Sequence, residues 1–120
     1  MTTPQTKAHY EKTIQERQND IAKINLKYPE QICIYVDKYE KCNNIKNLEN
    51  HKYLSPKTMI LAQFMYVIRQ RLVLEKNVGL IFFINNMVPS PQATLGELYE
   101  KNKNDDGFLY IIYTGENCFG

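Results

Sequence analysis

Apolar residues recur at helical spacing in the middle of the chain. After Pro56, five of them fall at i, i+3, i+4, i+7 and i+11; they are Leu61, Phe64, Met65, Ile68 and Leu72. Residues at these intervals share one face of an α-helix. The pattern therefore predicts a main helix that begins after Pro56 and buries this stripe against the rest of the protein.

A second helical pattern lies between Tyr10 and Leu26. Its apolar positions are Tyr10, Ile14, Ile21 and Ile24, and charged residues fill many of the others. This pattern predicts an amphipathic helix, either continuous or broken near its start. The helix should end at Tyr28, because a residue that precedes proline is disfavoured in the α region.

Four segments have the patterns of β-strands. Residues 31–37 carry apolar side chains on both alternating faces, and residues 52–55 form a short second strand. The continuous apolar run at 79–84 is typical of a central strand that is covered on both faces. Residues 108–113 are the last strand, and the turn at 105–107 leads into it.

Two further segments connect these elements. Residues 38–50 are rich in Lys, Asn and Glu, and we expect a solvated loop with little packing there. Thr94 and Glu97 have the spacing of a capping box, which predicts a short helix with Leu95 and Leu98 on its apolar side.

The predicted order is helix, strand, strand, helix, strand, helix, strand, within 120 residues that suffice for one domain. A hairpin, a main helix across it, a central strand and a final strand are the β-grasp arrangement of the α+β class. A ferredoxin-like fold is the alternative, but it would require a second crossover helix of comparable length. We therefore predict one α+β domain with the β-grasp arrangement.

The composition argues against several classes of function. Fifteen basic and thirteen acidic residues give a net charge of +2, which indicates neither nucleic-acid binding nor a polybasic membrane anchor. No segment resembles a signal peptide or is long enough to span a bilayer, so a cytosolic protein is expected. The sequence lacks a glycine-rich phosphate loop and a metalloprotease motif, and we expect that the protein is not an enzyme.

The cysteines do not indicate a metal or cofactor site. Cys33, Cys42 and Cys118 are scattered, with no spacing typical of zinc ligands, so reduced thiols and no metal are expected. Cys118 lies third from the end, whereas a prenylation box places its cysteine fourth from the end. We assign no chemistry to this residue.

Six segments resemble, in sequence order, the autophagy-related ubiquitin-like modifiers of the GABARAP and light-chain-3 type. The resemblance covers the chain from about His9 to Gly120. The six segments are Lys27-Tyr28-Pro29-Glu30, Lys52-Tyr53-Leu54-Ser55-Pro56, Gln63-Phe64 with Ile68-Arg69-Gln70-Arg71, Phe83-Ile84-Asn85-Asn86, Leu98-Tyr99 and Asp106-Gly107-Phe108-Leu109-Tyr110. The resemblance implies a ubiquitin-like β-grasp fold with a two-helix N-terminal extension. It divides the chain into a helical extension at 1–27, a β-grasp domain at 28–113 and a flexible conjugation tail at 114–120.

The resemblance also implies a function in autophagy. Family members are joined through a C-terminal glycine to phosphatidylethanolamine on the autophagosomal membrane, where they bind cargo receptors and autophagy machinery. The implied partners are activating and carrier enzymes, and a cysteine protease that processes and deconjugates the protein. The chain is then a substrate without catalytic residues of its own. We expect a monomer in the cytoplasm before conjugation and a membrane-bound form on the autophagosome afterwards.

The resemblance assigns lipid conjugation to Gly120 and recognition of the tail to Phe119. A glycine has no Cβ, so on a mobile tail it can enter a narrow enzyme channel and be joined to an amine. A truncation that happens to end at glycine is the alternative interpretation of this position.

A peptide site is implied as well, at an edge strand that accepts an aromatic-x-x-aliphatic peptide as an added strand. The residues that correspond to the aromatic pocket are Ile24, Cys33, Tyr35, Lys52, Leu54 and Phe108. Those that correspond to the aliphatic pocket are Tyr53, Pro56, Met59, Phe64 and Val67. Lys52 and Arg71 are expected to contact acidic groups of the ligand.

Some of these residues can also be explained without a peptide site, as ordinary core or surface residues. Met59, Phe64 and Val67 would contribute to the core of the main helix in any case, and Lys52 alone would be an ordinary solvated lysine. The basic residues of the N-terminal helix indicate either contact with a membrane or tubulin, or simply a solvated face.

The chain departs from the family pattern at several positions of this site. Cys33 replaces a proline, and Ser55 replaces an aliphatic residue, which should make the second pocket shallower. Gln31, Asn50 and His51 stand where basic residues are common. We expect weaker binding of acidic peptides than in close relatives, with a smaller salt effect. A non-conjugated peptide-binding adaptor of the same fold, or a structural hub without a groove, remains an alternative function.

Overall fold

The computed structural model describes residues 8–116. The elements are the 3-10 turn η1 (His9–Glu11), α1 (Ile14–Lys27), β1 (Gln31–Lys38), β2 (Lys52–Pro56), α2 (Leu61–Leu72), β3 (Leu80–Phe83), α3 (Leu95–Asn102) and β4 (Leu109–Gly115). Their order is the predicted one. The helical extension is broken near its start, between η1 and α1.

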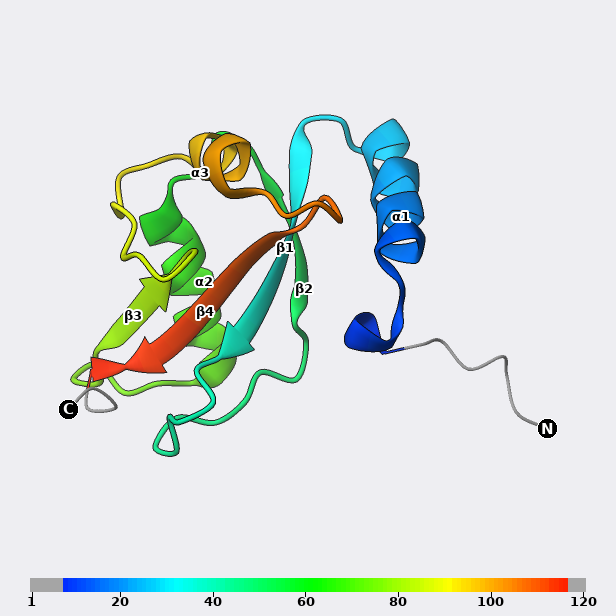
Figure 1. Cartoon of the computed structure of the whole chain (residues 1–120). Coiled ribbons are helices and arrows are strands. Elements are labelled where there is room, and N and C mark those ends of the chain that lie inside the picture. Colours follow the sequence, from blue (N-terminus) through cyan, green and yellow to red (C-terminus); the bar gives the residue numbers. More distant parts are fainter. Residues whose placement is uncertain (1–7, 117–120) are drawn as a thin grey trace.

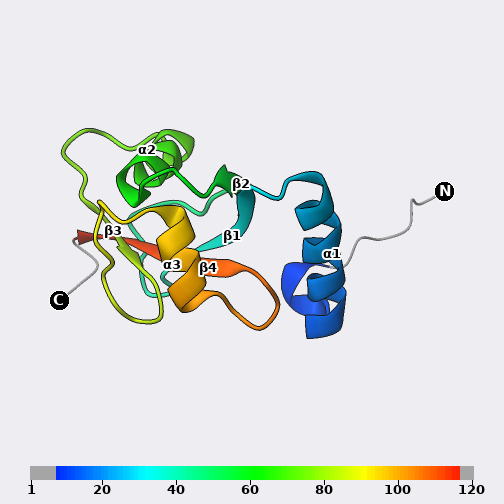
Figure 2. The same ribbon diagram turned by 90° about the horizontal axis from the view of Figure 1, so that it is seen from above.

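The four strands form one mixed sheet in the order β2-β1-β4-β3. The two middle strands, β1 and β4, are parallel, and the outer strands pair antiparallel with them. Figures 1 and 2 show α2 and α1 on opposite sides of β1 and β2. The predicted α+β β-grasp arrangement with a helical N-terminal extension is confirmed.

The main core lies between α2 and one face of the sheet. β1 contributes Ile32, Ile34 and Val36, which alternate along the strand and are each at most 3% exposed. Four of the five residues of the predicted helical stripe pack against them, and these are Leu61, Phe64, Ile68 and Leu72. Met65 is only partly buried at the margin of the core.

A smaller apolar cluster joins α1 to the opposite face of the sheet. Ile21 packs there with Cys33, Tyr35 and Phe108, and Ile24 packs at its margin. Because Cys33 and Tyr35 alternate with the residues of the main core, β1 is covered on both faces, as predicted. The cluster is small, so polar contacts must share in holding α1 in place.

A capping box positions the start of α1. The Thr13 side chain accepts a hydrogen bond from the Glu16 N–H at 3.1 Å, and the Glu16 carboxylate accepts one from the Thr13 N–H at 2.8 Å. These bonds satisfy backbone donors that a helix start leaves unpaired. Tyr10 and Ile14, predicted on the apolar side, are 61% and 49% exposed. Neither residue is buried in the cluster, although the Tyr10 ring meets the cluster residue Tyr35 edge-on at 5.3 Å.

The prediction of a solvated segment at 38–50 is wrong. Cys42, Ile45 and Leu48 are buried and belong to the main core. The Tyr113 hydroxyl accepts a hydrogen bond from the Leu48 N–H at 3.2 Å and donates one to the Lys46 carbonyl at 2.8 Å. Three apolar residues among many polar ones are thus enough to fix this loop.

The expectation of reduced thiols holds for Cys33, which is free and buried. Cys42, in contrast, is disulfide-bonded, so the expectation is wrong at that position.

The structure also differs from the predictions in the position of one strand and the length of another. The apolar run at 79–84 forms β3 at an edge of the sheet rather than its centre, and Phe82 alone is fully buried within Leu80–Phe83. An apolar run shows that a strand is covered but not how many neighbours it has. β4 extends two residues past the predicted end, because Thr114 and Gly115 pair with Ile81 and Leu80.

Candidate functional site

β2 is an edge strand of the sheet, and residues of this strand line a cavity. The Val36 N–H donates to the His51 carbonyl at 2.9 Å. Hydrogen-bonded pairs recur at every second residue of an antiparallel ladder, so Lys52 and Leu54 direct their backbone groups outward. An exposed edge of this kind can accept an added strand.

The Asn50 side chain occupies part of this edge. Its amide nitrogen donates to the Lys52 carbonyl at 3.1 Å, and its oxygen accepts from the Lys52 N–H at 3.4 Å. These are the two backbone groups that an added strand would also use.

A cavity of about 440 Å³ lies beside β2 on the side covered by α1. It is lined by Lys12, Asp20, Lys23, Ile24, Cys33, Lys52, Tyr53, Leu54 and Phe108. Five of the six residues expected in an aromatic pocket are therefore brought together, since Ile24, Cys33, Lys52, Leu54 and Phe108 all line the cavity. We call it the α1 cavity.

Tyr35, the sixth residue, does not line the α1 cavity. It is 8% exposed, and the His9 ring stacks on it with ring centroids 3.8 Å apart. η1 thus covers Tyr35, a contact that no spacing in the sequence indicates.

Three charged residues of the N-terminal extension line the α1 cavity and were not predicted to do so. Lys12 and Asp20 form an ion pair of 2.6 Å, and Lys23 lies one helical turn from Asp20. Asp20, Lys23 and Ile24 are spaced at i, i+3 and i+4, so their common face could have been recognised from Ile24.

The α1 cavity has several apolar lining residues, and three lysines against one aspartate, Asp20, among its charged ones. Burial raises the pKa of the Cys33 thiol to about 11, so the thiol is neutral at physiological pH and serves as an apolar wall. Burial, and then the nearby Lys12, lower the pKa of Lys52. The Lys52 ammonium lies 6.0 Å from the centre of the Phe108 ring, at the mouth of the cavity.

The residues expected in an aliphatic pocket lie on the other face of β2, toward α2. Tyr53 is partly buried and meets the Phe64 ring edge-on at 5.7 Å. Phe64 is 1% exposed and belongs to the main core, which is the role that the helical pattern alone predicts for it. Met59 and Val67 are half-buried, and Pro56 is exposed. These residues form a shallow apolar surface.

Arg71 lines a second cavity, of about 210 Å³, together with Lys46, Asn47, Leu48, Glu49, Asn50 and Tyr53. Tyr53 lines both cavities, so they lie on either side of this residue. Lys52 and Arg71, the two residues expected to contact acids, therefore belong to different cavities next to the same strand.

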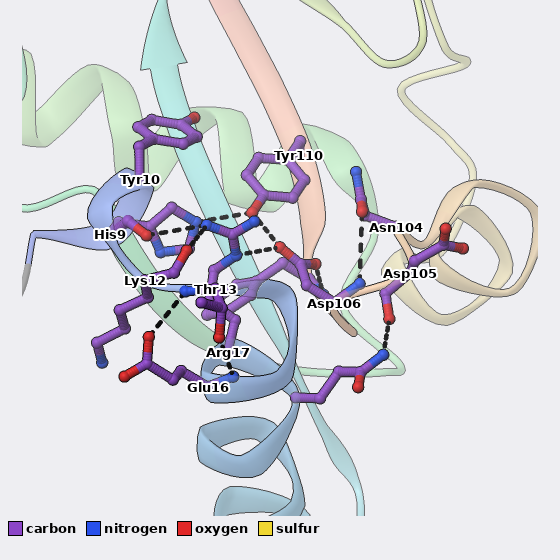
Figure 3. A network of polar contacts seen from close by, with 12 residues as sticks. His9, Tyr10, Lys12, Thr13, Glu16, Arg17, Asn104, Asp105, Asp106 and Tyr110 are labelled. Carbon is purple, nitrogen blue, oxygen red and sulfur yellow. Dashed lines mark hydrogen bonds and ion pairs between the residues drawn. The ribbon is translucent and has the colours of Figure 1, made fainter.

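A buried polar network ties the N-terminal extension to the turn before β4 (Figure 3). The Asp106 carboxylate, 1% exposed, lies 2.9 Å from the Arg17 guanidinium and accepts a hydrogen bond from the Tyr110 hydroxyl. The Tyr110 hydroxyl lies 2.7 Å from His9 Nε2. Arg17 also donates to the carbonyls of His9 and Lys12, at 3.0 and 2.9 Å. None of these contacts was predicted.

Gly107 allows α1 to approach this turn. Its φ of 91° lies in the left-handed region, and a Cβ at this position would be 2.9 Å from the Ile21 side chain. A larger residue would therefore strain the turn and push α1 away.

Within residues 8–116, no group of three or more His, Cys, Asp or Glu side chains is placed to hold a metal ion. None of the helices in this range is long and apolar enough to cross a membrane.

The sheet order, the helix across one face and the accessible strand edge define a ubiquitin-like protein of the β-grasp class. The family model described as "Autophagy protein Atg8 ubiquitin like" matches residues 16–120. The chain belongs to this family of ubiquitin-like autophagy proteins.

Individual relatives agree with this assignment. Autophagy-related protein 8d of Arabidopsis thaliana is 37% identical over 111 residues, which are 92% of each chain. Autophagy-related protein 8B of Oryza sativa subsp. indica is 38% identical over 108 residues, or 90% of each. The crystal structure of Trypanosoma brucei ATG8 superimposes with a TM-score of 0.85 at 33% identity, covering 96% of this chain and all of the other.

Proposed function

We propose that the protein is an autophagy modifier that is conjugated through Gly120 to phosphatidylethanolamine and binds aromatic-x-x-aliphatic peptides along β2. The observation that carries the peptide-binding part is the α1 cavity beside the accessible edge of β2. Cargo receptors and autophagy machinery are its proposed ligands. The proposed location is the cytoplasm, and the autophagosomal membrane after conjugation.

The spacing of the proposed peptide motif fits the two faces of β2. In an extended peptide, residues i and i+3 point to opposite faces, because side chains alternate along a strand. An aromatic residue can then enter the α1 cavity while the aliphatic residue rests on Tyr53 and its neighbours toward α2. Backbone hydrogen bonds to Lys52 and Leu54 would hold the peptide between them.

Substitution of Leu54 tests the peptide site. Leu54 is 39% exposed and lines the α1 cavity, so Leu54→Asp should fold normally yet place a charge where the aromatic residue enters. Calorimetric titration with a Trp-x-x-Leu peptide should show at least a tenfold loss of affinity. Tyr66→Ala is the matched control, because Tyr66 is 63% exposed on α2 and does not line this cavity. Equal loss in both variants would contradict the proposed site.

Conjugation is proposed because the family match extends to residue 120. The glycine carboxylate would be activated with ATP as an adenylate, passed as a thioester to the cysteine of a carrier enzyme and transferred to the lipid amine. These cysteines belong to partner enzymes, so this chain is a substrate rather than an enzyme. Phe119 and Gly120 lie outside the described residues, and their roles remain proposals.

Incubation with matched activating and carrier enzymes, ATP and phosphatidylethanolamine liposomes tests the conjugation. The protein should gain the mass of the lipid, and Gly120→Ala should abolish this gain. Absence of product from the unchanged protein would favour the alternative, a non-conjugated peptide-binding adaptor.

A further inference from the structure

A buried histidine holds η1 on the sheet. His9 is 6% exposed and is the one buried residue of η1. Its ring stacks on Tyr35 at 3.8 Å, with 18° between the ring planes, and meets Phe108 edge-on at 4.9 Å. Tyr10, its neighbour, is 61% exposed. Its hydroxyl donates a hydrogen bond to the Asp37 carboxylate and its ring meets Tyr35 edge-on at 5.3 Å, so Tyr10 adds a solvent-exposed contact to the buried one made by His9.

Hydrogen bonds fix the protonation state of the His9 ring (Figure 3). The Tyr110 hydroxyl donates its single hydrogen to Asp106, so it must accept from His9 Nε2, 2.7 Å away. His9 Nδ1 is then unprotonated, and among residues 8–116 it is buried without a hydrogen-bond partner. A second proton would occupy Nδ1, where no acceptor faces it.

Charged and titratable groups surround the ring on every packed element. They are Tyr10 of η1, Arg17 of α1, Tyr35 and Asp37 of β1, Lys52 of β2, Asp106 of the turn before β4, and Tyr110 of β4. Burial is the largest influence and lowers the pKa of His9 from 6.5 to about 4; Lys52 and Arg17 act in the same direction. The Asp106 and Asp37 carboxylates oppose this shift without cancelling it.

The segment that His9 anchors also builds one side of the α1 cavity. Lys12, Asp20, Lys23 and Ile24 line it from this segment, and β1, β2 and Phe108 directly before β4 supply the rest. Arg17 donates to the carbonyls of His9 and Lys12, so movement of η1 breaks contacts that reach into α1. The shape of the cavity is thus coupled to the attachment of His9.

We propose that protonation of His9 on acidification releases η1 and the start of α1 from the sheet, which dismantles the α1 cavity and lowers its affinity for peptides. This inference rests on the proposed peptide-binding function. It makes the N-terminal extension an acid-sensitive wall of the site.

The direction of the pH effect follows from proton linkage. The docked state prefers the neutral ring, so docking is fully favourable above the ordinary pKa of 6.5 and weakens as the pH falls from there toward about 4. For these two pKa values, the docking equilibrium shifts toward release by about thirtyfold between pH 7.5 and pH 5. Below a pH of about 4, the docking equilibrium shifts no further.

Titration with a Trp-x-x-Leu peptide that has blocked ends and no Asp, Glu or His tests this proposal. Between pH 7.5 and pH 5, the affinity of the unchanged protein should fall by at least about threefold, and by no more than the thirtyfold shift of the docking equilibrium, because the apparent affinity follows the docked fraction. His9→Phe retains a stacked ring that cannot titrate, and its affinity should stay within twofold over this range. His51→Gln is the matched control, since the chain has only two histidines, and this variant should keep the full pH effect.

NMR spectra of the unchanged protein give a readout that is independent of any variant. The His9 ring should titrate below its ordinary pKa of 6.5, and the amide signals of residues 14–24 should shift with it. A His9 pKa at or above 6.5, an affinity that does not depend on pH, or an equal pH effect in a folded His9→Phe variant would overturn the proposal. If no peptide binds at pH 7.5, the proposed function fails, and the amide signals alone decide whether acid releases the extension.

Discussion

At the scale of single residues, a few polar side chains decide which backbone groups of the peptide site are accessible. Asn50 hydrogen-bonds both the N–H and the carbonyl of Lys52. An incoming peptide must replace these bonds with its own backbone groups. Because both bonds are exposed and the one from the Lys52 N–H is long, at 3.4 Å, this competition is weak.

Removal of the Asn50 amide should therefore strengthen peptide binding. We expect Asn50→Ala to raise the affinity for a neutral Trp-x-x-Leu peptide by about threefold, corresponding to about half of the net value of one hydrogen bond. Calorimetric titration measures this change. Asn47→Ala is the control: Asn47 lines the same cavity as Asn50 and Arg71 but, within residues 8–116, makes no hydrogen bond to β2, so this substitution should have no effect. A lower affinity for Asn50→Ala would show that Asn50 assists the peptide.

At the scale of elements, α1 depends on its first turn more than on its apolar face. Ile21 is its single fully buried residue, and the capping box of Thr13 and Glu16 pairs its first backbone donors. The apolar spacing predicts a helix in this region but not the break that precedes it. That break follows from the capping box, a local signal at Thr13 that the apolar pattern does not include.

Loss of this cap should destabilise α1 measurably. Thr13→Ala should lower the free energy of unfolding by about 1 kcal/mol, because the Glu16 N–H loses its acceptor. Urea unfolding followed by circular dichroism measures the change. Thr58→Ala, at an exposed position before α2, should change stability by less than about half of this amount. Equal effects of the two substitutions would contradict a specific role for the cap.

At the scale of the whole molecule, Asp106 joins segments that are far apart in the sequence. Its carboxylate contacts Arg17 from the extension and Tyr110 from β4, and it accepts a hydrogen bond from the Phe108 N–H at 2.9 Å. A charge that is 1% exposed is stable only while these partners surround it. The contact therefore holds the extension and the domain together.

Neutralisation of this carboxylate should cost much of the stability of the fold. Asp106→Asn leaves Arg17 without its buried counter-charge, and we expect a loss of about 3 kcal/mol in the free energy of unfolding. Asp105→Asn, one residue earlier and exposed, should be nearly neutral. Parallel urea titrations of the two variants make the comparison. Similar stability of both would indicate that the network contributes little.

By itself, the sequence determined the order of the elements, the stripe of α2 and the fold class, because periodicity and turn residues are local signals. Five residues that the resemblance assigns to an aromatic pocket, including Leu54 and Phe108, line the α1 cavity, and their role in peptide binding stays a prediction. Only the tertiary structure decided that β3 lies at an edge, that residues 38–50 pack into the core, and that Tyr35 lies beneath His9. These features depend on contacts between residues distant in the chain, and no local spacing encodes which distant partner a buried side chain will meet.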